Sequence, residues 1–207
     1  MRSMIKEENM RNQSGFTLIE AMIVIAVIGI MTAVAVASSL SYLPDMRLKS
    51  ASRDLYSNLQ KAKMMAVKTN TSHAVFFDTA NNLYQIIDLG PDGTLGTIDD
   101  LPQAPIFLSN YKSYIGYGYG NATIPANPDG VFPGNGVSFN DPTDLDTVIF
   151  NSRGMLLNVG FIGNVYLSNN TTNNRPIIER SSFVVGVPVV TGIIRMSKWY
   201  NGSNSWD

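Results

Sequence analysis

Residues 14–43 read SGFTLIEAMIVIAVIGIMTAVAVASSLSYL, and the rest of the chain is organised around this stretch. The segment from Ala21 to Leu40 contains no charged residue. Twenty helical residues at about 1.5 Å each span about 30 Å, the thickness of a bilayer's hydrocarbon core, so the stretch predicts a membrane-spanning helix. Glu20 lies at its beginning, and an unpaired carboxylate is costly to bury in such a place, so we expect Glu20 to have a charged partner.

Two simpler interpretations compete for this stretch. A secretory signal peptide would explain the basic residues before position 12 and the small residues Ala35-Val36-Ala37. Its apolar region is normally about 7 to 15 residues, however, and Phe16 to Val34 is longer and contains Glu20. A plain single-span anchor explains the length, but it leaves Glu20 and the residues before it unexplained.

The run Ser14-Gly15-Phe16-Thr17-Leu18-Ile19-Glu20, preceded by a short charged leader, resembles the prepilin motif of type IV pilins and type II secretion pseudopilins. The resemblance implies that a membrane peptidase cuts after Gly15 and N-methylates Phe16, which leaves residues 16–207. It also implies that Glu20 acts in filament assembly. A carboxylate there can pair with the new α-amine on Phe16 of a neighbouring subunit and so fix the axial register of the helices. Many family members have a proline where this chain has Ala37.

Composition limits the choice of function. The 207 residues have a net charge of −1, which gives no overall electrostatic case for nucleic-acid binding. There is no cysteine and only one histidine, His73, and the only glutamates after the leader are Glu20 and Glu179. A histidine-based triad or a pair of catalytic glutamates has almost no residues to draw on. A membrane-anchored enzyme is therefore the weakest of the interpretations, and we predict no enzymatic activity and no catalytic residues.

The predicted domains are a leader at 1–15, a transmembrane and filament-core helix at 16–43, its amphipathic continuation at 44–70, and a β-rich head at 71–207. Asp45, after Pro44, is expected to cap the amphipathic part. Its apolar residues recur at steps of three and four and fall on one helical face, which we expect to pack on the head: Leu48, Ala51, Leu55, Leu59, Ala62 and Ala66.

The head's sequence predicts an antiparallel sheet. The expected strands are 73–77, 83–88, 147–150, 161–167, 177–185 and 189–196, separated by turn residues such as Asn151-Ser152-Arg153-Gly154. Residues 109–146 are rich in Gly, Tyr, Pro, Asn and Asp and predict a long variable loop with short strands at 131–132 and 136–139. We expect its tyrosines to pack on the head.

One loop of the head is acidic. Residues 88–100 contain four carboxylates, Asp88, Asp92, Asp99 and Asp100, among glycines that permit tight turns. Calcium takes six to eight oxygen ligands, so this loop is a candidate calcium site, although its spacing is not that of an EF-hand. The ordinary alternative is a polar turn without an ion. No other cofactor is predicted.

The order of the head resembles the GspH/FimT family, the minor pseudopilins of type II secretion and related minor type IV pilins. The resemblance rests on the 48–66 helix running into the His73 strand, on Val148–Gly154 and on Val189–Arg195. It implies an α+β fold with a long N-terminal helix, membrane-spanning in its first half and amphipathic in its second, packed on an antiparallel head. The implied function is a structural subunit near the tip of a periplasmic pseudopilus in a type II protein secretion system.

The resemblance also implies partners and a location. The partners are other pseudopilins or pilins, the prepilin peptidase and an inner-membrane assembly platform. The chain would cross the bacterial inner membrane once, with its head in the periplasm. The alternative is a minor type IV pilin that primes pilus assembly or binds DNA during uptake. Only Arg195 and Lys198 near the C-terminus would serve DNA, which weighs against nucleic acid as a partner.

Overall fold

The computed structural model describes residues 15–112, 115–120, 122–126, 131–139, 146–157, 163–169, 182–189, 191–200 and 203–206. The chain divides into two compact units, Met1–Tyr42 and Leu43–Asp207. One helix, α1 (Leu18–Thr69), contributes residues to both. Every other element belongs to the second unit, which is the head.

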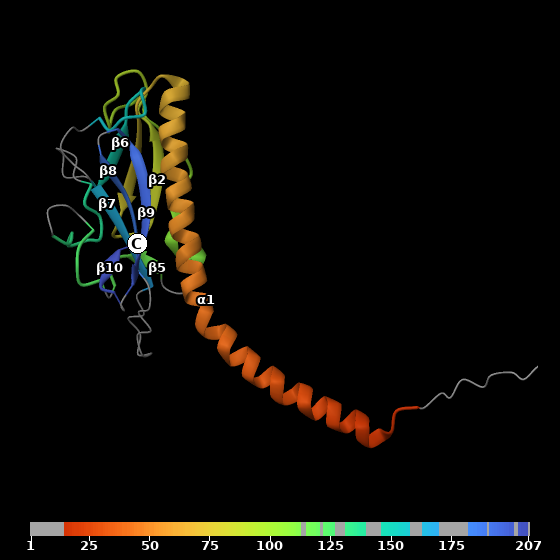
Figure 1. Ribbon diagram of the computed structural model, residues 1–207. Coiled ribbons are helices and arrows are strands. Elements are labelled where there is room, and N and C mark those ends of the chain that lie inside the picture. Colours follow the sequence, from red (N-terminus) through yellow and green to blue (C-terminus); the bar gives the residue numbers. More distant parts are fainter. Residues whose placement is uncertain are drawn as a thin grey trace, which may run out of the picture. The chain divides into compact units, whose positions relative to one another are not determined.

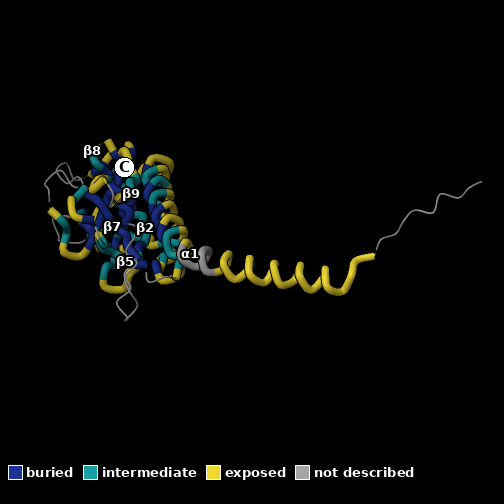
Figure 2. Tube along the Cα trace, turned by 60° about the horizontal axis from the view of Figure 1, so that its bottom comes forward, coloured by how far each residue is buried: buried dark blue, intermediate teal, exposed yellow. Residues whose placement is uncertain are grey.

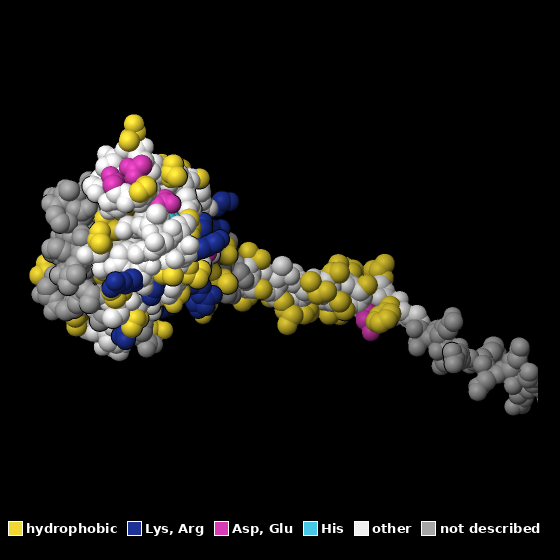
Figure 3. All heavy atoms as spheres, turned by 90° about the horizontal axis from the view of Figure 1, so that it is seen from above, with side chains coloured by type: hydrophobic (Ala, Val, Ile, Leu, Met, Phe, Trp, Pro, Cys, Tyr) yellow, Lys and Arg dark blue, Asp and Glu magenta, His cyan; other side chains and the backbone are white. Residues whose placement is uncertain are grey.

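The described part of the first unit is an apolar helix whose side chains are exposed. All residues from 18 to 36 are exposed, including Ile19, Ile25 and Met31, which are each about two-thirds exposed. Figure 3 shows hydrophobic side chains along this segment, and Figure 2 shows that none of it is buried. A helix that is apolar on all sides is stable only in an apolar environment, which is either lipid or other apolar helices.

Helix α1 continues through Pro44, so the predicted new helix start at Asp45 is wrong. A proline inside a helix removes one backbone hydrogen bond and costs about 3 kcal/mol, which is why the sequence suggests a break there. Packing of the following turns on the head can outweigh that cost, because most helical stability in proteins comes from an amphipathic face.

The predicted face of the second part of α1 is confirmed. Its six apolar positions are all fully buried: Leu48, Ala51, Leu55, Leu59, Ala62 and Ala66. Lys49 and Arg53 lie outside this face and are exposed. Lys63 is partly buried, and its Nζ donates a hydrogen bond of 2.9 Å to the carbonyl oxygen of Gly192.

The described strands of the head form two antiparallel sheets of five strands each (Figure 1). The first has the order β3-β2-β1-β6, with β4 also paired to β2. The second has the order β10-β9-β8-β7-β5. The strand bounds are β1 His73–Asp78, β2 Leu83–Asp88, β3 Leu101–Pro102, β4 Ile106–Phe107, β5 Ile115–Tyr117, β6 Thr147–Phe150, β7 Gly163–Asn169, β8 Ser182–Val189, β9 Ile193–Tyr200 and β10 Ser205–Trp206, and a short 3-10 helix, η1, covers Leu108–Tyr111.

A single core joins the buried face of α1 to both sheets. Alternate residues of the longer strands in both sheets point into it, as the period of two in a strand requires. The first sheet contributes residues such as Phe77 and Phe150, and the second contributes residues such as Leu167 and Phe183. The predicted α+β class, with the helix packed on antiparallel sheets, is confirmed.

Two strand predictions need correction. The expected ranges 177–185 and 189–196 place a turn at 186–188, but β8 runs through these residues to Val189 and β9 begins at Ile193. Residues 177–181 lie outside the described part. Pro188 is tolerated because the β8–β9 register shifts between Gly186 and Val189, so the missing N–H falls at an irregular pair. The chain reverses instead near Gly192, whose φ is +70°.

The variable loop contributes to the second sheet. It contains β5, which pairs with β7, whereas residues 131–132 form no strand and 136–139 make only the single bridge Val137↔Val165. The expectation that the loop's tyrosines pack on the head is confirmed for Tyr111 and Tyr117, which pack against the core, and Tyr114 lies outside the described residues. Tyr117 donates a hydrogen bond from its hydroxyl to the carbonyl oxygen of Leu83 (2.8 Å), and the ring of Tyr119 stacks on Phe132 at 4.2 Å.

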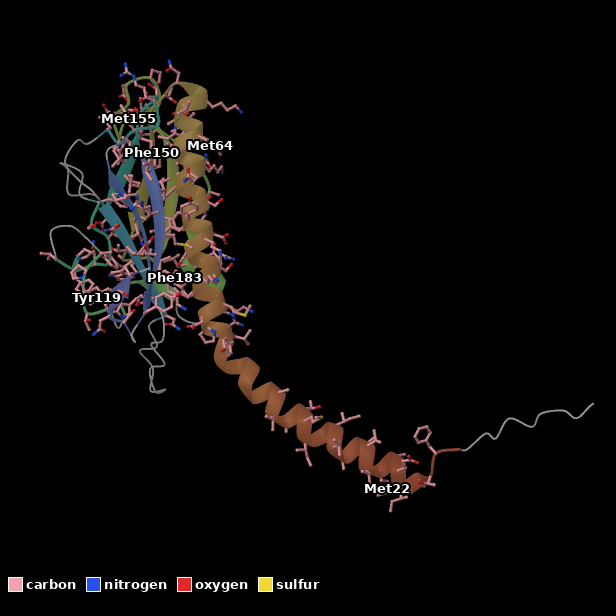
Figure 4. All side chains as sticks on the ribbon, in the orientation of Figure 1. Met22, Met64, Tyr119, Phe150, Met155 and Phe183 are labelled. Carbon is pink, nitrogen blue, oxygen red and sulfur yellow. The ribbon has the colours of Figure 1, made fainter. Side chains whose placement is uncertain are left out.

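An aromatic layer covers the face of the second sheet that points away from the core. Tyr119, Phe132, Tyr166, Trp199 and Trp206 form a chain of ring contacts with centroids 4.2 to 5.8 Å apart. Figure 4 labels Tyr119 in the loop, away from Phe183 of the core. As a result β7 is buried along its whole length, on both faces.

Replacing Leu55 by alanine is expected to destabilise the head by about 2 to 5 kcal/mol, because Leu55 is fully buried and its removal leaves a cavity. The matched control is Ser57→Ala on the exposed side of the same helical turn, which should change the stability by about 0.5 kcal/mol or less. Urea unfolding of the two variants in detergent compares them. Equal midpoints would show that the helix does not stabilise the head.

The head is also expected to lose stability in alkali. Burial raises the pKa of Tyr84 to about 12, and the charge of Asp54 adds to the effect, although a hydrogen bond from Asn58 opposes it. Burial raises the pKa values of Tyr111 and Tyr117 as well. Because the folded state keeps these phenols neutral, their stabilisation is fully present below about pH 10 and is lost as the pH rises toward 12.

Melting temperatures at about pH 8 and about pH 11 measure this loss. Tyr84→Phe removes one titrating group, so its melting temperature should fall less steeply between the two pH values. A melting temperature that stays constant in the unchanged protein would contradict the prediction.

Candidate functional site: the N-terminal processing and assembly segment

The predicted cleavage junction lies before the first helical residue. Gly15, Phe16 and Thr17 are not helical, and α1 begins at Leu18. Gly15 is exposed, and a Cβ added to it would meet no atom within 4 Å. The side chain of Phe16 is 85% exposed. The bond between Gly15 and Phe16 therefore lies outside the helix and is accessible, as a protease requires of the bond that it cuts.

Thr17 caps the start of the helix. Its Oγ1 accepts a hydrogen bond of 3.3 Å from the backbone N–H of Glu20, and its carbonyl oxygen accepts one of 3.2 Å from Ala21. Thr and Glu three residues apart have the spacing of a capping box, of which the bond to the Thr17 side chain is formed here. The sequence signal for this cap is the spacing of Thr17 and Glu20.

Glu20 lies in the first turn of α1. A carboxylate there interacts favourably with the positive end of the helix dipole, which is a structural reason for an acidic residue at this position. The side chain is exposed, and among the described residues its carboxylate has neither an ion-pair nor a hydrogen-bond partner. Glu20 is therefore available to a group outside this chain.

The helical segment that contains Glu20 is long enough to cross a membrane. Leu18–Val36, 19 residues, passes that test by length and composition, and none of it is buried. Met22, two residues after Glu20, projects away from the helix axis and is 57% exposed (Figure 4). The exposed cleavage junction, the capped helix start and the apolar helix thus follow one another within residues 15–36.

The acidic loop is held by hydrogen bonds within the loop and to its flanks. Asp88 accepts from the Thr71 hydroxyl (3.0 Å) and Asp92 from the Thr94 N–H (2.8 Å). Asp100 accepts from the Gly96 N–H (2.7 Å). The Thr97 hydroxyl donates to Asp99 at 2.7 Å and keeps the pKa of that carboxyl below its usual value. These bonds are what a polar turn requires.

The four aspartates do not form a common cluster in the structure. In the described part of the chain, no three His, Cys, Asp or Glu side chains come together as a group that would hold a metal ion. Leu89 and Leu95 of the loop instead pack on a small hydrophobic cluster with Ala74 and Ile149. Calcium binding at Asp88, Asp92, Asp99 and Asp100 stays a prediction.

His73 lies buried at the start of β1. Its Nε2 is 3.7 Å from Asp88 Oδ2, and neither ring nitrogen has a hydrogen-bond partner among the described residues. No second histidine exists in the sequence to complete a site with it.

The two bases predicted as a weak nucleic-acid site lie on opposite faces of β9. Arg195 pairs with Gly186 and Lys198 with Phe183 in a regular register, so their offset of three positions places the two side chains on opposite faces of the sheet. Lys198 Nζ lies 5.8 Å from the ring centre of Phe183 and 5.4 Å from that of Tyr200. Arg195 is exposed. The structure does not bring the two cations together on one surface.

The comparisons with known proteins bear on the N-terminal segment. Residues 10–36 match the family model of the prokaryotic N-terminal methylation motif. No curated protein sequence matches the chain.

Among solved structures, the chain is similar to the minor pseudopilin EpsH from the type 2 secretion system of Vibrio cholerae. The identity is 12%, the TM-score is 0.45, and the match covers 72% of this chain and 95% of the other. It is also similar to the type IV minor pilin FimU of Pseudomonas aeruginosa, at 14% identity and a TM-score of 0.40, with 77% and 96% coverage. From the match over residues 10–36, the chain carries a prokaryotic N-terminal methylation motif.

Proposed function

We propose that this chain is a minor pseudopilin, a structural subunit near the tip of the periplasmic pseudopilus of a type II protein secretion system, and that it is not an enzyme. The observation that carries the proposal is the order of features in residues 15–36. An exposed cleavage junction, a capped helix start with Glu20 and an exposed apolar helix follow one another where the methylation motif matches.

Processing is the first step of the proposed function. A prepilin peptidase cuts between Gly15 and Phe16 and methylates the α-amine of Phe16. Two features of the chain support this step, because the junction is not helical and no described atom crowds Gly15.

Assembly is the second step. The new α-amine on Phe16 is a cation four residues before the carboxylate of Glu20. In a filament, the Glu20 carboxylate of one subunit meets the Phe16 amine of a neighbouring pilin or pseudopilin. Apolar helices can slide along one another, whereas a buried charge pair has one favourable position, so the pair sets the axial register.

The proposed location follows from the same segment. Before assembly the apolar helix crosses the inner membrane once, with the leader in the cytoplasm and the head in the periplasm. An inner-membrane platform then extracts the subunit into the filament. A predominantly apolar helical segment of 19 residues without a buried side chain supports this placement.

The mass and N-terminal sequence of the protein recovered from membranes test the processing step. A chain that begins at N-methylated Phe16 agrees with the proposal. A chain that begins near Ser38 would be a cleaved secretory protein, and one that retains Met1 would be a plain anchored protein, so either result would overturn it.

Deletion of the gene decides between secretion and piliation. Loss of exoprotein secretion with intact pili, together with co-purification of other pseudopilins, is expected. Loss of surface pili or of DNA uptake with normal secretion would instead identify a minor type IV pilin.

A further inference from the structure

A groove lies on the outer face of the second sheet, the face that carries the aromatic layer. Three neighbouring strands place Asn164, Gly186 and Arg195 in one row, through the pairs Asn164↔Gly186 and Gly186↔Arg195. Gly186 has no side chain, and Asn164 Oδ1 lies in the space that a Cβ there would need. A hollow of about 460 Å³ lies over this row and is lined by residues of β7, β8 and β9.

Two further segments, the variable loop and the segment with β10, form the walls of the groove. Ile124, Pro125 and Ala126 of the variable loop form one side, and Trp206 of β10 lies close by. The Trp206 indole N–H donates a hydrogen bond of 2.7 Å to the Ile124 carbonyl oxygen, so the loop and β10 are tied together there. The groove is thus part of the folded head.

Arg195 gives the groove its charge. Of the described residues that line it, Arg195 alone carries a charged side chain. The side chain is exposed, and no ion pair to it occurs within the described residues. Ser197 lies two residues further along β9 and therefore on the same face. The chemistry of the groove favours an anionic group with hydrogen-bond acceptors.

The edge of β9 next to the groove is open over most of its length. On one side β9 pairs with β8. On the other side β10 pairs only through Ser205↔Tyr200 and Trp206↔Trp199. Among the described strands, none pairs with Ile193–Lys198 on that side. An edge of this kind presents free N–H and C=O groups in the geometry that an added strand needs.

We propose that the groove and the open edge of β9 together form a docking site for an extended segment of a partner protein, which adds as a strand beside β9 and places an acidic side chain against Arg195. Side chains directly opposite each other on neighbouring strands lie about 4.5 to 5.5 Å apart, within reach of an Arg–carboxylate pair. Ile193, on the same face, is 48% exposed. The segment therefore carries an acidic residue with an apolar residue two positions away.

A single strand of nucleic acid is the competing occupant, and the structure favours the peptide. Nucleic-acid grooves combine several cations with aromatic faces that are free to stack on bases. Here Lys198 lies on the other face, and the Trp206 ring is engaged by Trp199 and Tyr166 at 5.2 and 5.6 Å. One cation beside a strand edge matches a peptide carboxylate better. The proposal does not depend on which filament machinery the chain serves.

The test uses the full-length protein in detergent micelles and a blocked peptide, Thr-Val-Thr-Asp-Thr-Val-Thr, whose symmetric pattern suits either strand direction. Amide hydrogen exchange and NMR shifts report binding. The peptide is expected to bind saturably below about 1 mM and to protect the amides of Ile193–Lys198. A control peptide with Lys in place of Asp should bind at least about tenfold more weakly.

Charge reversal makes the test specific. The Arg195→Glu substitution should lower the affinity for the Asp peptide about tenfold or more. The variant protein should bind the Lys peptide instead. Because Arg195 is exposed, the variant should keep the melting temperature of the unchanged protein. Several outcomes would overturn the proposal: equal binding of both peptides, no binding of either at about 1 mM, protection elsewhere on the head, or preferential binding of a single-stranded oligonucleotide.

Discussion

Replacing Gly15 by valine is expected to leave an uncleaved precursor in the membrane, with processing slowed about 100-fold or more. A peptidase holds its scissile bond within about 1 Å of the reactive geometry, and a branched side chain beside that bond displaces it. The chain itself tolerates the change. Gly15 does not have a left-handed φ, and a Cβ there meets open space. Immunoblots and intact masses of membrane fractions measure the ratio of precursor to mature protein.

Gly29→Ala is the matched control for this prediction. Gly29 lies in the same apolar segment, and a Cβ added there also meets no atom within 4 Å. The control should mature at the normal rate. Normal maturation of the Gly15 variant would show that no prepilin peptidase acts at this junction, and the proposed function would fall with it.

Replacing Glu20 by valine is expected to leave processing and membrane insertion unchanged and to lower incorporation into filaments at least about tenfold. Removing one partner of a buried charge pair costs about 3 to 5 kcal/mol, because the Phe16 amine of the neighbour is then buried alone. Glu20→Gln, which keeps the shape and removes the charge, should fail in the same way. Chemical crosslinking in cells, followed by measurement of the share of the subunit that is joined to other pseudopilins, gives the incorporation.

Thr17→Ala separates assembly from helix capping. The Thr17 Oγ1 accepts its hydrogen bond from the backbone N–H of Glu20 and not from the side chain. Both Glu20 variants therefore retain that hydrogen bond. Loss of the cap itself costs only about 0.5 to 2 kcal/mol of helix stability and should leave incorporation nearly normal. Equal incorporation of Glu20→Gln and the unchanged protein would refute the register role of Glu20.

Much of the fold could be predicted because its signals are local. The burial of Leu48, Leu55 and Leu59 follows from helical periodicity, which survives whatever surface the helix packs on. Strand β6, Thr147–Phe150, has the predicted bounds because the turn at Asn151–Gly154 ends it. Asn151 Oδ1 accepts from two following N–H groups there, and Gly154 has a φ of +72°.

The rest depends on tertiary contacts that a sequence pattern does not contain. Gly186 and Pro188 suggest a turn in isolation, but Asn164 from another strand fills the space above Gly186 and keeps β8 extended. Strands of two or three residues, such as β5 and β10, have too few residues to show a period. They exist because a neighbouring strand offers them an edge.

In the candidate sites too, some residues could be predicted from local sequence and others depend on tertiary contacts. Gly15, Phe16 and Glu20 could be named from the sequence because a motif places them next to one another, and each still awaits its experimental test. The exposure of Arg195 beside an open strand edge could not be foreseen, since it depends on the register between β8 and β9.

The aromatic layer bears on where the head can be labelled. A tag or fluorophore inserted between Tyr117 and Ala126 would separate Tyr119 and Ile124 from the sheet and uncover rings that now contact one another. Ile98, in the acidic loop, projects fully into solvent. A probe attached at Ile98 would leave the packed layers undisturbed and allow the subunit to be followed by light microscopy during export.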